Sequence, residues 1–362
     1  SYKLDRITGG FRMKLLKKII IIITVTVIVM ETLIEAVPLN SHNDSTNPVN
    51  VGVVFYRFDD PYVIDLRHSL EDIESRNEGI VKFNFYNSEN NRDIQNQTIN
   101  NLLESGNIDL LILSLVDLVN DPKELINSIK EKNIPVIFAS KRILKVDENI
   151  VKSYDKAYYI LPDSEQAGRL QGKLLANLWN GNKNTIDTNK DNIMQYIVLQ
   201  GGINSNSNES TDRTKYCIMT IRDAGIKVEQ LASEFCNWSE DLARDATDAL
   251  LTRYGNKIEV VIANNDTMAV GAVKALQKHG YNKGDGTKNI PVVGIDAIPE
   301  SLYFIQKGYM AGTVFQDPDV MANAFFDVAM HLSGKIRFEC PKEYRCDESG
   351  RIIQLPFKEY MA

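Results

Sequence analysis

The feature that most constrains the fold is a regular alternation of short apolar runs and longer amphipathic stretches between residues 51 and 307. Apolar runs such as Val51–Tyr56 and Leu110–Leu113 have the length and composition of buried strands. Stretches such as Pro61–Ser75 and Glu240–Tyr254 carry apolar residues close to helical spacing. Strands that alternate with helices of this length predict parallel sheets covered by helices on both faces. This alternation of strands and helices occurs in two successive runs, so we predict an α/β protein with two doubly wound, Rossmann-like lobes.

The other predicted elements continue the alternation of strands and helices. Further strands are expected at residues 81–86, 135–138, 194–199, 227–231, 259–263 and 291–295. Further helices are expected at residues 92–103, 122–131, 164–179, 211–224, 267–278 and 299–307.

Composition excludes several classes of function. The 362 residues leave room for about two domains. A net charge of -7 disfavours binding to nucleic acid, because an acidic surface gains nothing from releasing the counterions of a polyanion. Four histidines leave little room for a His-rich metal centre. We find no Ser-His-Asp order, nucleophile elbow, Gly-rich phosphate loop or zinc-type Cys/His spacing, so we predict that the protein is not an enzyme.

The N-terminal region reads as an export signal over residues 1–37. A basic stretch from Lys14 to Lys18 precedes an uncharged apolar run, Ile19–Met30, and Ala36 follows as a small residue. The run is short for a spanning helix, which needs about 20 residues. Retention of this segment as a membrane anchor is the alternative to cleavage. Both alternatives place the body of the protein outside the cytoplasm. Residues 1–12 precede Met13 and can be an over-extended start.

Residues 38–50 are polar and rich in Pro and Asn, which is typical of a flexible linker.

Polar side chains follow most of the predicted strands. Asp60 and Tyr62 follow the first strand, Asn264 to Asp266 follow the strand at 259–263, and Asp296 follows the strand at 291–295. Others are Ser114, Asp117, Ser140, Lys141, Arg142 and residues 200–209. Ligands of open α/β sheets bind beyond the carboxyl ends of the strands. Carboxylates and amides suit sugar hydroxyls, and Tyr62 and Trp238 can cover the apolar face of a pyranose. The alternative for each polar residue is a turn or a helix cap, as for Asp60 before Pro61 and Asp266 before Thr267.

A second polar cluster resembles a calcium-binding loop. Oxygen ligands at loop positions 1, 3, 5, 7 and 9 would come from Asp187, Asn189, Asp191, the Ile193 carbonyl and Gln195. Position 6 is Asn192 in place of Gly, although Asn tolerates a positive φ. Position 12 is Val198, so the bidentate carboxylate must come from elsewhere. The alternative is an Asx-rich turn before a strand.

The cysteines are too few for a disulfide scaffold. Cys217 lies in a predicted helix and is expected to be a buried small residue. Cys340 and Cys346 flank a polar segment near the C-terminus. A local disulfide is expected there, because the body of the protein is expected outside the cytoplasm.

Several stretches together resemble the periplasmic galactose/glucose-binding proteins of ABC sugar import and chemotaxis. The resemblance covers roughly residues 50 to 335 and, more loosely, the last dozen residues. The stretches that carry it are Tyr56–Asp60, Ser153–Tyr159, Asp187–Gln195, Lys257–Asp266, Val293–Glu300 and Ala311–Val314.

The resemblance implies two lobes that are joined by three crossings, with a ligand cleft between them. We assign residues 51–139 and 316–335 to an N-terminal lobe, residues 140–313 and 351–362 to a C-terminal lobe, and residues 336–350 to an insertion.

The resemblance also implies roles for individual residues. Asp60, Asn265 and Asp296 would bind sugar hydroxyls, and Arg213 would bind the ring oxygen and the anomeric side. Tyr62 and Trp238 would stack on the two faces of the ring. For calcium, the resemblance supplies the missing carboxylate from Glu259.

Some positions depart from the family pattern. Ser114 and Gln316 stand where the family has Asn, and Ser207 and Glu209 stand where it has His and Asp. Each lost hydrogen bond costs about 0.5–1.5 kcal/mol. Galactose or glucose is the leading ligand because of the resemblance. A pentose or a modified sugar is the alternative, because the changed positions can lose hydrogen bonds to a hexose.

The partners follow from the same resemblance. A membrane ABC permease would read the ligand-closed form of a monomeric binding protein. The alternative is a membrane-anchored sensing subunit that signals to a chemoreceptor or a sensor kinase.

Overall fold

The computed structural model describes residues 47–116, 123–139, 153–202, 209–286 and 288–360. The predicted signal, most of the predicted linker, and Asp117, Ser140, Lys141, Arg142 and Ser207 lie outside the described residues. None of the helices in these ranges is long and apolar enough to cross a membrane.

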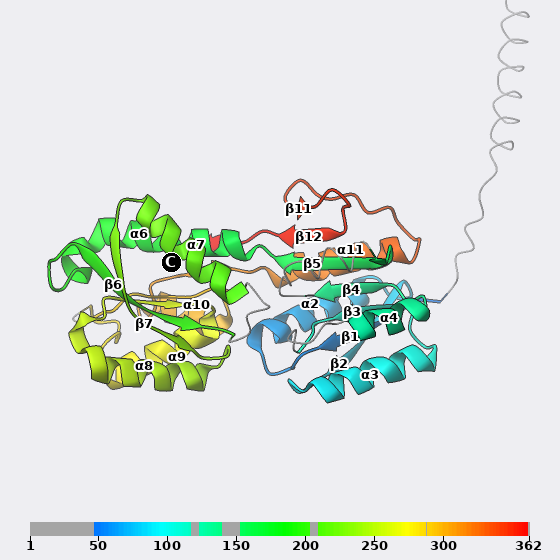
Figure 1. Ribbon diagram of the computed structural model, residues 1–362, viewed down its shortest axis with the longest axis horizontal. Coiled ribbons are helices and arrows are strands. Elements are labelled where there is room, and N and C mark those ends of the chain that lie inside the picture. The colour runs from blue at the N-terminus through cyan, green and yellow to red at the C-terminus, as the bar shows by residue number, and fades with distance from the viewer. Residues whose placement is uncertain (1–46, 117–122, 140–152, 203–208, 287, 361–362) are drawn as a thin grey trace, which may run out of the picture. The chain divides into compact units, whose positions relative to one another are not determined.

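The first lobe is built on a seven-stranded sheet with the order β11-β12-β5-β4-β3-β1-β2 (Figure 1). Its strands are β1 (Val49–Phe55), β2 (Val81–Asn87), β3 (Leu110–Leu113), β4 (Val136–Ala139), β5 (Ala157–Pro162), β11 (Arg345–Cys346) and β12 (Ile352–Leu355). Neighbouring strands are parallel except for β11 and β12. Every residue of β3 and β4 is buried, which explains their continuous apolar sequences.

Helices cover both faces of this sheet. On one face, α2 (Pro61–Arg76) and α11 (Pro318–Leu332) pack through Leu70 and Phe325 into one apolar cluster. On the other face, α3 (Arg92–Ser105) and α4 (Lys123–Glu131) pack into a second cluster that includes Ile99 and Ile129.

The second lobe is built on a four-stranded parallel sheet with the order β7-β6-β8-β9. Its strands are β6 (Ile193–Gln200), β7 (Lys227–Phe235), β8 (Val260–Ala263) and β9 (Val292–Val293). Two parallel bridges, Val293 to Gly312 and Asp296 to Phe315, connect the end of this sheet to β10 (Thr313–Phe315). The last strand, β13 (Lys358–Tyr360), pairs antiparallel with β10.

Helices also cover both faces of the second sheet (Figure 1). One face carries α6 (Ser164–Ile186) and α7 (Glu209–Asp223), and the other carries α8 (Glu240–Tyr254) and α9 (Asp266–Lys278). A short 3-10 helix (Gly255–Lys257) and α10 (Pro299–Gln306) complete the lobe. The predicted fold class, two doubly wound lobes with parallel sheets, is therefore confirmed.

The expected lobe boundaries need correction. Residues 157–162 were assigned to the second lobe, but they form β5, which pairs with β4 in the first sheet. Residues 352–355 also belong to the first sheet, since β12 pairs with β5. The expected insertion at 336–350 contributes β11, which extends the same sheet. The chain passes between the lobes three times: from β5 to α6, from β10 to α11 and from β12 to β13.

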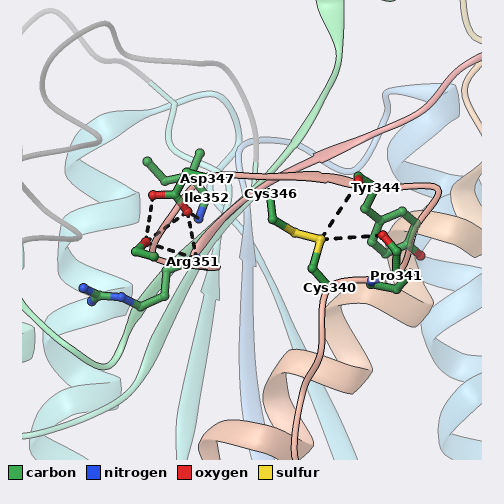
Figure 2. Close-up of a disulfide and its surroundings, with 8 residues drawn as sticks. Cys340, Pro341, Tyr344, Cys346, Asp347, Arg351 and Ile352 are labelled. Carbon is green, nitrogen blue, oxygen red and sulfur yellow. Dashed lines mark hydrogen bonds between the residues drawn. A yellow bond between two sulfur atoms is a disulfide. The ribbon is translucent and has the colours of Figure 1, made fainter.

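The predicted disulfide is present between Cys340 and Cys346 (Figure 2). It closes the loop that leads into β11, and the turn after β11 is held by Asp347, which accepts hydrogen bonds from the Ile352 and Arg351 amides. Arg345 on β11 forms an ion pair of 3.2 Å with Asp163, at the start of α6. The disulfide loop is thus connected to the first crossing. Cys217 is buried, as predicted.

Candidate functional site

A cavity of about 100 Å³ lies where both sheets present their carboxyl ends. All nine residues that were predicted to bind ligand line this one cavity: Asp60, Tyr62, Ser114, Glu209, Arg213, Trp238, Asn265, Asp296 and Gln316. Eight further lining residues were not predicted: Phe55, Tyr56, Val63, Leu66, Ala139, Pro162, Met321 and Phe325. Tyr56 ends the first predicted strand, so its position in the sequence was a usable signal.

Asp60 serves as a helix cap and also lines the cavity. Its Oδ1 accepts hydrogen bonds from the amides of Tyr62 (2.9 Å) and Val63 (3.4 Å) at the start of α2. Its Oδ2 accepts a hydrogen bond from the Tyr56 hydroxyl. Asp60 is therefore a helix cap, and it also lies at the cavity, where a ligand-binding role would require it.

Arg213 is the largest charged group in the wall of the cavity and is only 2% exposed. Its Nη1 donates to the Asn264 carbonyl at 2.7 Å, and its Nη2 donates to Glu209 at 2.9 Å and to Gln316 at 3.2 Å. Its Nε is buried and has no hydrogen-bond partner among the described residues. Because Gln316 lies on the second crossing, Arg213 connects the second lobe to the hinge.

Asn265 caps α9, and this corrects the prediction that Asp266 is the cap. Asn265 Oδ1 accepts a hydrogen bond from the Met268 amide at 3.0 Å. This leaves the Nδ2 donors of Asn265 for a ligand. Asp266 is instead the first residue of the helix and is fully buried.

Asp266 holds the turn that presents Asp296. Its Oδ2 accepts hydrogen bonds from the Ile298 amide (3.1 Å) and the Ser301 hydroxyl (2.5 Å), and its Oδ1 accepts one from Thr313 (2.6 Å). These bonds surround a strained segment, because Asp296 has a φ of 125° and the next residue, Ala297, has a φ of 62°. The sequence did not predict this positioning role for Asp266.

The pKa values of the acidic groups in the cavity are shifted by burial. Burial raises the pKa of Asp296, and the Arg213 guanidinium at 3.9 Å opposes the rise. Burial also raises the pKa values of the Tyr56 and Tyr62 hydroxyls, so both phenols stay protonated and neutral near neutral pH.

Trp238 reaches the cavity because of an unusual backbone. Its φ is 59°, and its ring lies directly against Gly201. A Cβ atom on Gly201 would lie 2.2 Å from the ring of Trp238, so only glycine leaves room for the indole in this position. The Arg213 guanidinium lies 5.7 Å from the centre of the same ring.

The predicted calcium loop runs from the end of α6 into β6. Asn192 has a φ of 63°, so it adopts the backbone that Gly usually supplies at position 6. Glu259, which precedes β8, lies beside the loop and accepts hydrogen bonds from the amides of Thr188 (2.8 Å) and Gln195 (3.1 Å). Burial raises the pKa of Glu259, and the nearby Asp187 adds to the rise.

The loop fits a cation in one specific respect. Asp187 Oδ1 is buried and has no hydrogen-bond partner in the described ranges, whereas its Oδ2 accepts from the Asn192 amide at 3.1 Å. Asp191 accepts hydrogen bonds from the side chains of Asn189 (3.1 Å) and Gln195 (2.7 Å). No group of three or more His, Cys, Asp or Glu side chains that could hold a metal occurs in the described part of the chain. A cation here would therefore also need amide and carbonyl oxygens.

The Asp266 carboxyl makes the stability of the second lobe depend on pH. Burial raises its pKa from 3.8 to about 6. A raised pKa means that the folded state binds the proton more tightly than the unfolded state does, so protonation of Asp266 stabilises the fold. This stabilisation is fully present below the pKa of the unfolded state, 3.8, and is lost as the pH rises through about 6. Lowering the pH from about 7.5 to about 5 should therefore stabilise the protein by about 1 kcal/mol relative to its Asp266→Asn variant. Urea unfolding of both proteins at both pH values measures this difference, and equal responses of the two proteins would contradict it.

Comparison with known proteins places the chain among solute-binding proteins. Its sequence is 34% identical over 332 residues to a D-galactose/methyl-galactoside binding periplasmic protein of Haemophilus influenzae, covering 91% of this chain and 95% of that protein. It is also 28% identical over 246 residues to a xylitol-binding protein of Mycolicibacterium smegmatis, covering 67% of this chain and 62% of that protein.

Solved structures show the same fold. An ABC transporter solute-binding protein from Bacillus halodurans with bound myo-inositol superposes with a TM-score of 0.69 at 21% identity, covering 88% of this chain and 96% of that chain. A galactofuranose-binding protein superposes with a TM-score of 0.69 at 18% identity, covering 87% of this chain and 95% of that one. Residues 51–336 match the sequence profile of the periplasmic binding protein domain. The chain therefore belongs to the periplasmic binding protein family.

Proposed function

We propose that the protein is an extracytoplasmic solute-binding protein that captures a monosaccharide, with galactose or glucose as the leading ligand, and delivers it to an ABC importer. The observation that carries this proposal is the gathering of all nine predicted ligand residues around one cavity. They come from segments that are distant in sequence, such as Asp60 on the first lobe, Asn265 on the second, and Gln316 on a crossing. The set pairs carboxylate and amide groups with two aromatic rings, which suits the hydroxyls and the apolar faces of a pyranose.

The ligands named for the relatives are all polyhydroxylated, although the relatives differ in which ligand is named. The Haemophilus influenzae relative is described as binding galactose and methyl-galactoside. Other relatives are described as binding xylitol or xylose, and a solved neighbour holds myo-inositol. All of these molecules carry several neighbouring hydroxyl groups, so the shared chemistry favours a sugar or a sugar alcohol.

Hinge closure provides the mechanism of capture. The lobes are connected by three crossings, and the cavity takes its lining from both lobes. A ligand that bonds to Asp60 on one side and to Asn265 and Asp296 on the other stabilises the closed arrangement, because only that arrangement offers both sets of groups. A membrane permease then recognises and binds the closed form. A membrane-anchored sensing subunit is the alternative, and it depends on retention of Ile19–Met30, which lies outside the described residues.

We also propose that the Asp187 loop binds Ca²⁺ as a structural ion. The unpartnered, buried Asp187 Oδ1 supports this proposal, since a bound cation would satisfy it. Asn189, Asp191, the Ile193 carbonyl, Gln195 and Glu259 would supply the remaining oxygens.

The first test is binding of a sugar panel, measured by calorimetry on the exported form of the protein. Galactose or glucose should bind, and Asp296→Ala should weaken binding about 100-fold because a buried hydroxyl of the ligand loses its partner. Asp59→Ala is the matched control, because the Asp59 side chain is 83% exposed and does not line the cavity. The proposal fails if no monosaccharide binds, or if both variants lose affinity equally.

Neighbouring glycines test the position of Trp238. Gly201→Ala should displace the indole and weaken sugar binding at least about tenfold, because the new Cβ would overlap the ring. Gly202→Ala should leave affinity nearly unchanged, since its Cβ would lie 3.8 Å from Trp238 Nε1. Calorimetry gives both affinities, and tryptophan fluorescence reports the displacement. Equal affinities of the two variants would show that Trp238 does not contact the ligand.

Chelation tests the calcium proposal. Removing Ca²⁺ should lower the melting temperature, because an ion at 100 times its dissociation constant adds about 2.7 kcal/mol of stability. Asp187→Ala should abolish the response to Ca²⁺, whereas Asp223→Ala, an exposed aspartate at the end of α7, should retain it. If neither the chelator nor added Ca²⁺ changes the melting temperature, the calcium proposal is wrong and the loop is an Asx-rich turn.

A further inference from the structure

The two halves of the cavity differ in chemistry. The second lobe and the second crossing contribute mainly polar or charged side chains: Glu209, Arg213, Trp238, Asn265, Asp296 and Gln316. The first lobe contributes Tyr56, Asp60, Tyr62, Ser114 and Pro162 near the mouths of its strands and helix α2 and, beside them, a set of apolar side chains, which we call the apolar wall. It consists of Phe55, Val63, Leu66, Ala139, Met321 and Phe325.

The apolar wall is part of the core of the first lobe. All six side chains are at most 5% exposed and belong to one apolar cluster. They come from four elements: β1, α2, β4 and α11. The cavity therefore extends down to the core between α2 and α11, and it is not confined to the polar ends of the strands.

The polar groups beside this wall are partly engaged by the protein itself. Asp60 already accepts hydrogen bonds from the Tyr56 hydroxyl and from the amides of Tyr62 and Val63. None of the six wall residues carries a side-chain donor or acceptor stronger than the Met321 thioether. A hydroxyl that the ligand presented to this wall would lose its water and gain no comparable partner.

A hexopyranose has one group that suits such a wall. Its ring faces suit Tyr62 and Trp238, and its ring hydroxyls suit the polar half of the cavity. The exocyclic C6 group projects from the ring and is the one carbon that becomes a methyl group when its hydroxyl is removed. A methyl group there would gain from burial against the wall, whereas a hydroxymethyl group would lose hydrogen bonds.

We infer that the protein prefers a hexose that lacks the 6-hydroxyl, a 6-deoxyhexose, whose methyl group packs against the apolar wall. This inference rests on the proposed function, because it refines which hexose the same cavity takes. It does not require that galactose and glucose fail to bind.

Two matched pairs of sugars test the inference on the unmodified protein. Calorimetry compares D-galactose with 6-deoxy-D-galactose, and D-glucose with 6-deoxy-D-glucose. The sugars of each pair differ by one oxygen atom, so the ratio of their affinities reports the environment of C6 alone. We expect the deoxy sugar of at least one pair to bind about tenfold more tightly, or better, than its parent.

A substitution in the wall provides the reciprocal test. Met321→Gln replaces a thioether by an amide of similar length, which can bond to a 6-hydroxyl. It should shift the ratio toward the parent sugar by about tenfold. Met330→Gln is the matched control, because Met330 is a buried methionine on the same helix, α11, and does not line the cavity. It should leave the ratio unchanged.

The possible outcomes separate the inference from the proposed function. If both parents bind as well as or better than their deoxy partners, the inference is wrong and the proposed function stands. If no sugar of either pair binds, both the hexose proposal and the inference are overturned. If Met321→Gln does not fold, the ratios of the unmodified protein decide the matter alone.

Discussion

The buried guanidinium of Arg213 is the interaction on which the geometry of the site depends. A charge that is 2% exposed is tolerated only where hydrogen bonds compensate it, and here the partners come from three different segments. The Asn264 carbonyl is at the end of β8, Glu209 begins α7, and Gln316 lies on a crossing. One side chain therefore fixes the end of a strand, the start of a helix and the hinge relative to one another.

Helix caps explain how the other polar groups are held. Asp60 caps α2 and Asn265 caps α9, and both residues line the cavity. A cap uses one side-chain oxygen to bind amides at the helix start, which fixes the orientation of the whole group. The remaining atom, such as Asn265 Nδ2, can then serve a ligand with little further loss of conformational freedom. Capping a helix and lining the cavity are thus two roles of the same residue, and the sequence could not separate them.

Local patterns were sufficient where the structure is local. The helix at Glu240–Tyr254 and the strand at Leu110–Leu113 were predicted with their observed bounds, because spacing and apolar composition dominate there. Prediction was weaker where pairing is distant. β12 joins β5 across nearly 200 residues of sequence, and short strands such as β11 and β13 exist only because a neighbouring strand is present. The helix α11 was not predicted as an element, although residues 316–335 were assigned to the correct lobe.

The sequence by itself determined the fold class, the nine polar and aromatic residues around the cavity, and the local disulfide. Strand and helix periodicity, residue type and a recognisable family pattern are all readable along the chain. Only the tertiary structure decided which strands belong to which lobe, that Asp266 supports the strained turn at Asp296, and that an apolar wall faces the polar half of the cavity. The wall residues look like ordinary core residues in the sequence, because burial against a cavity and burial against protein select the same apolar side chains.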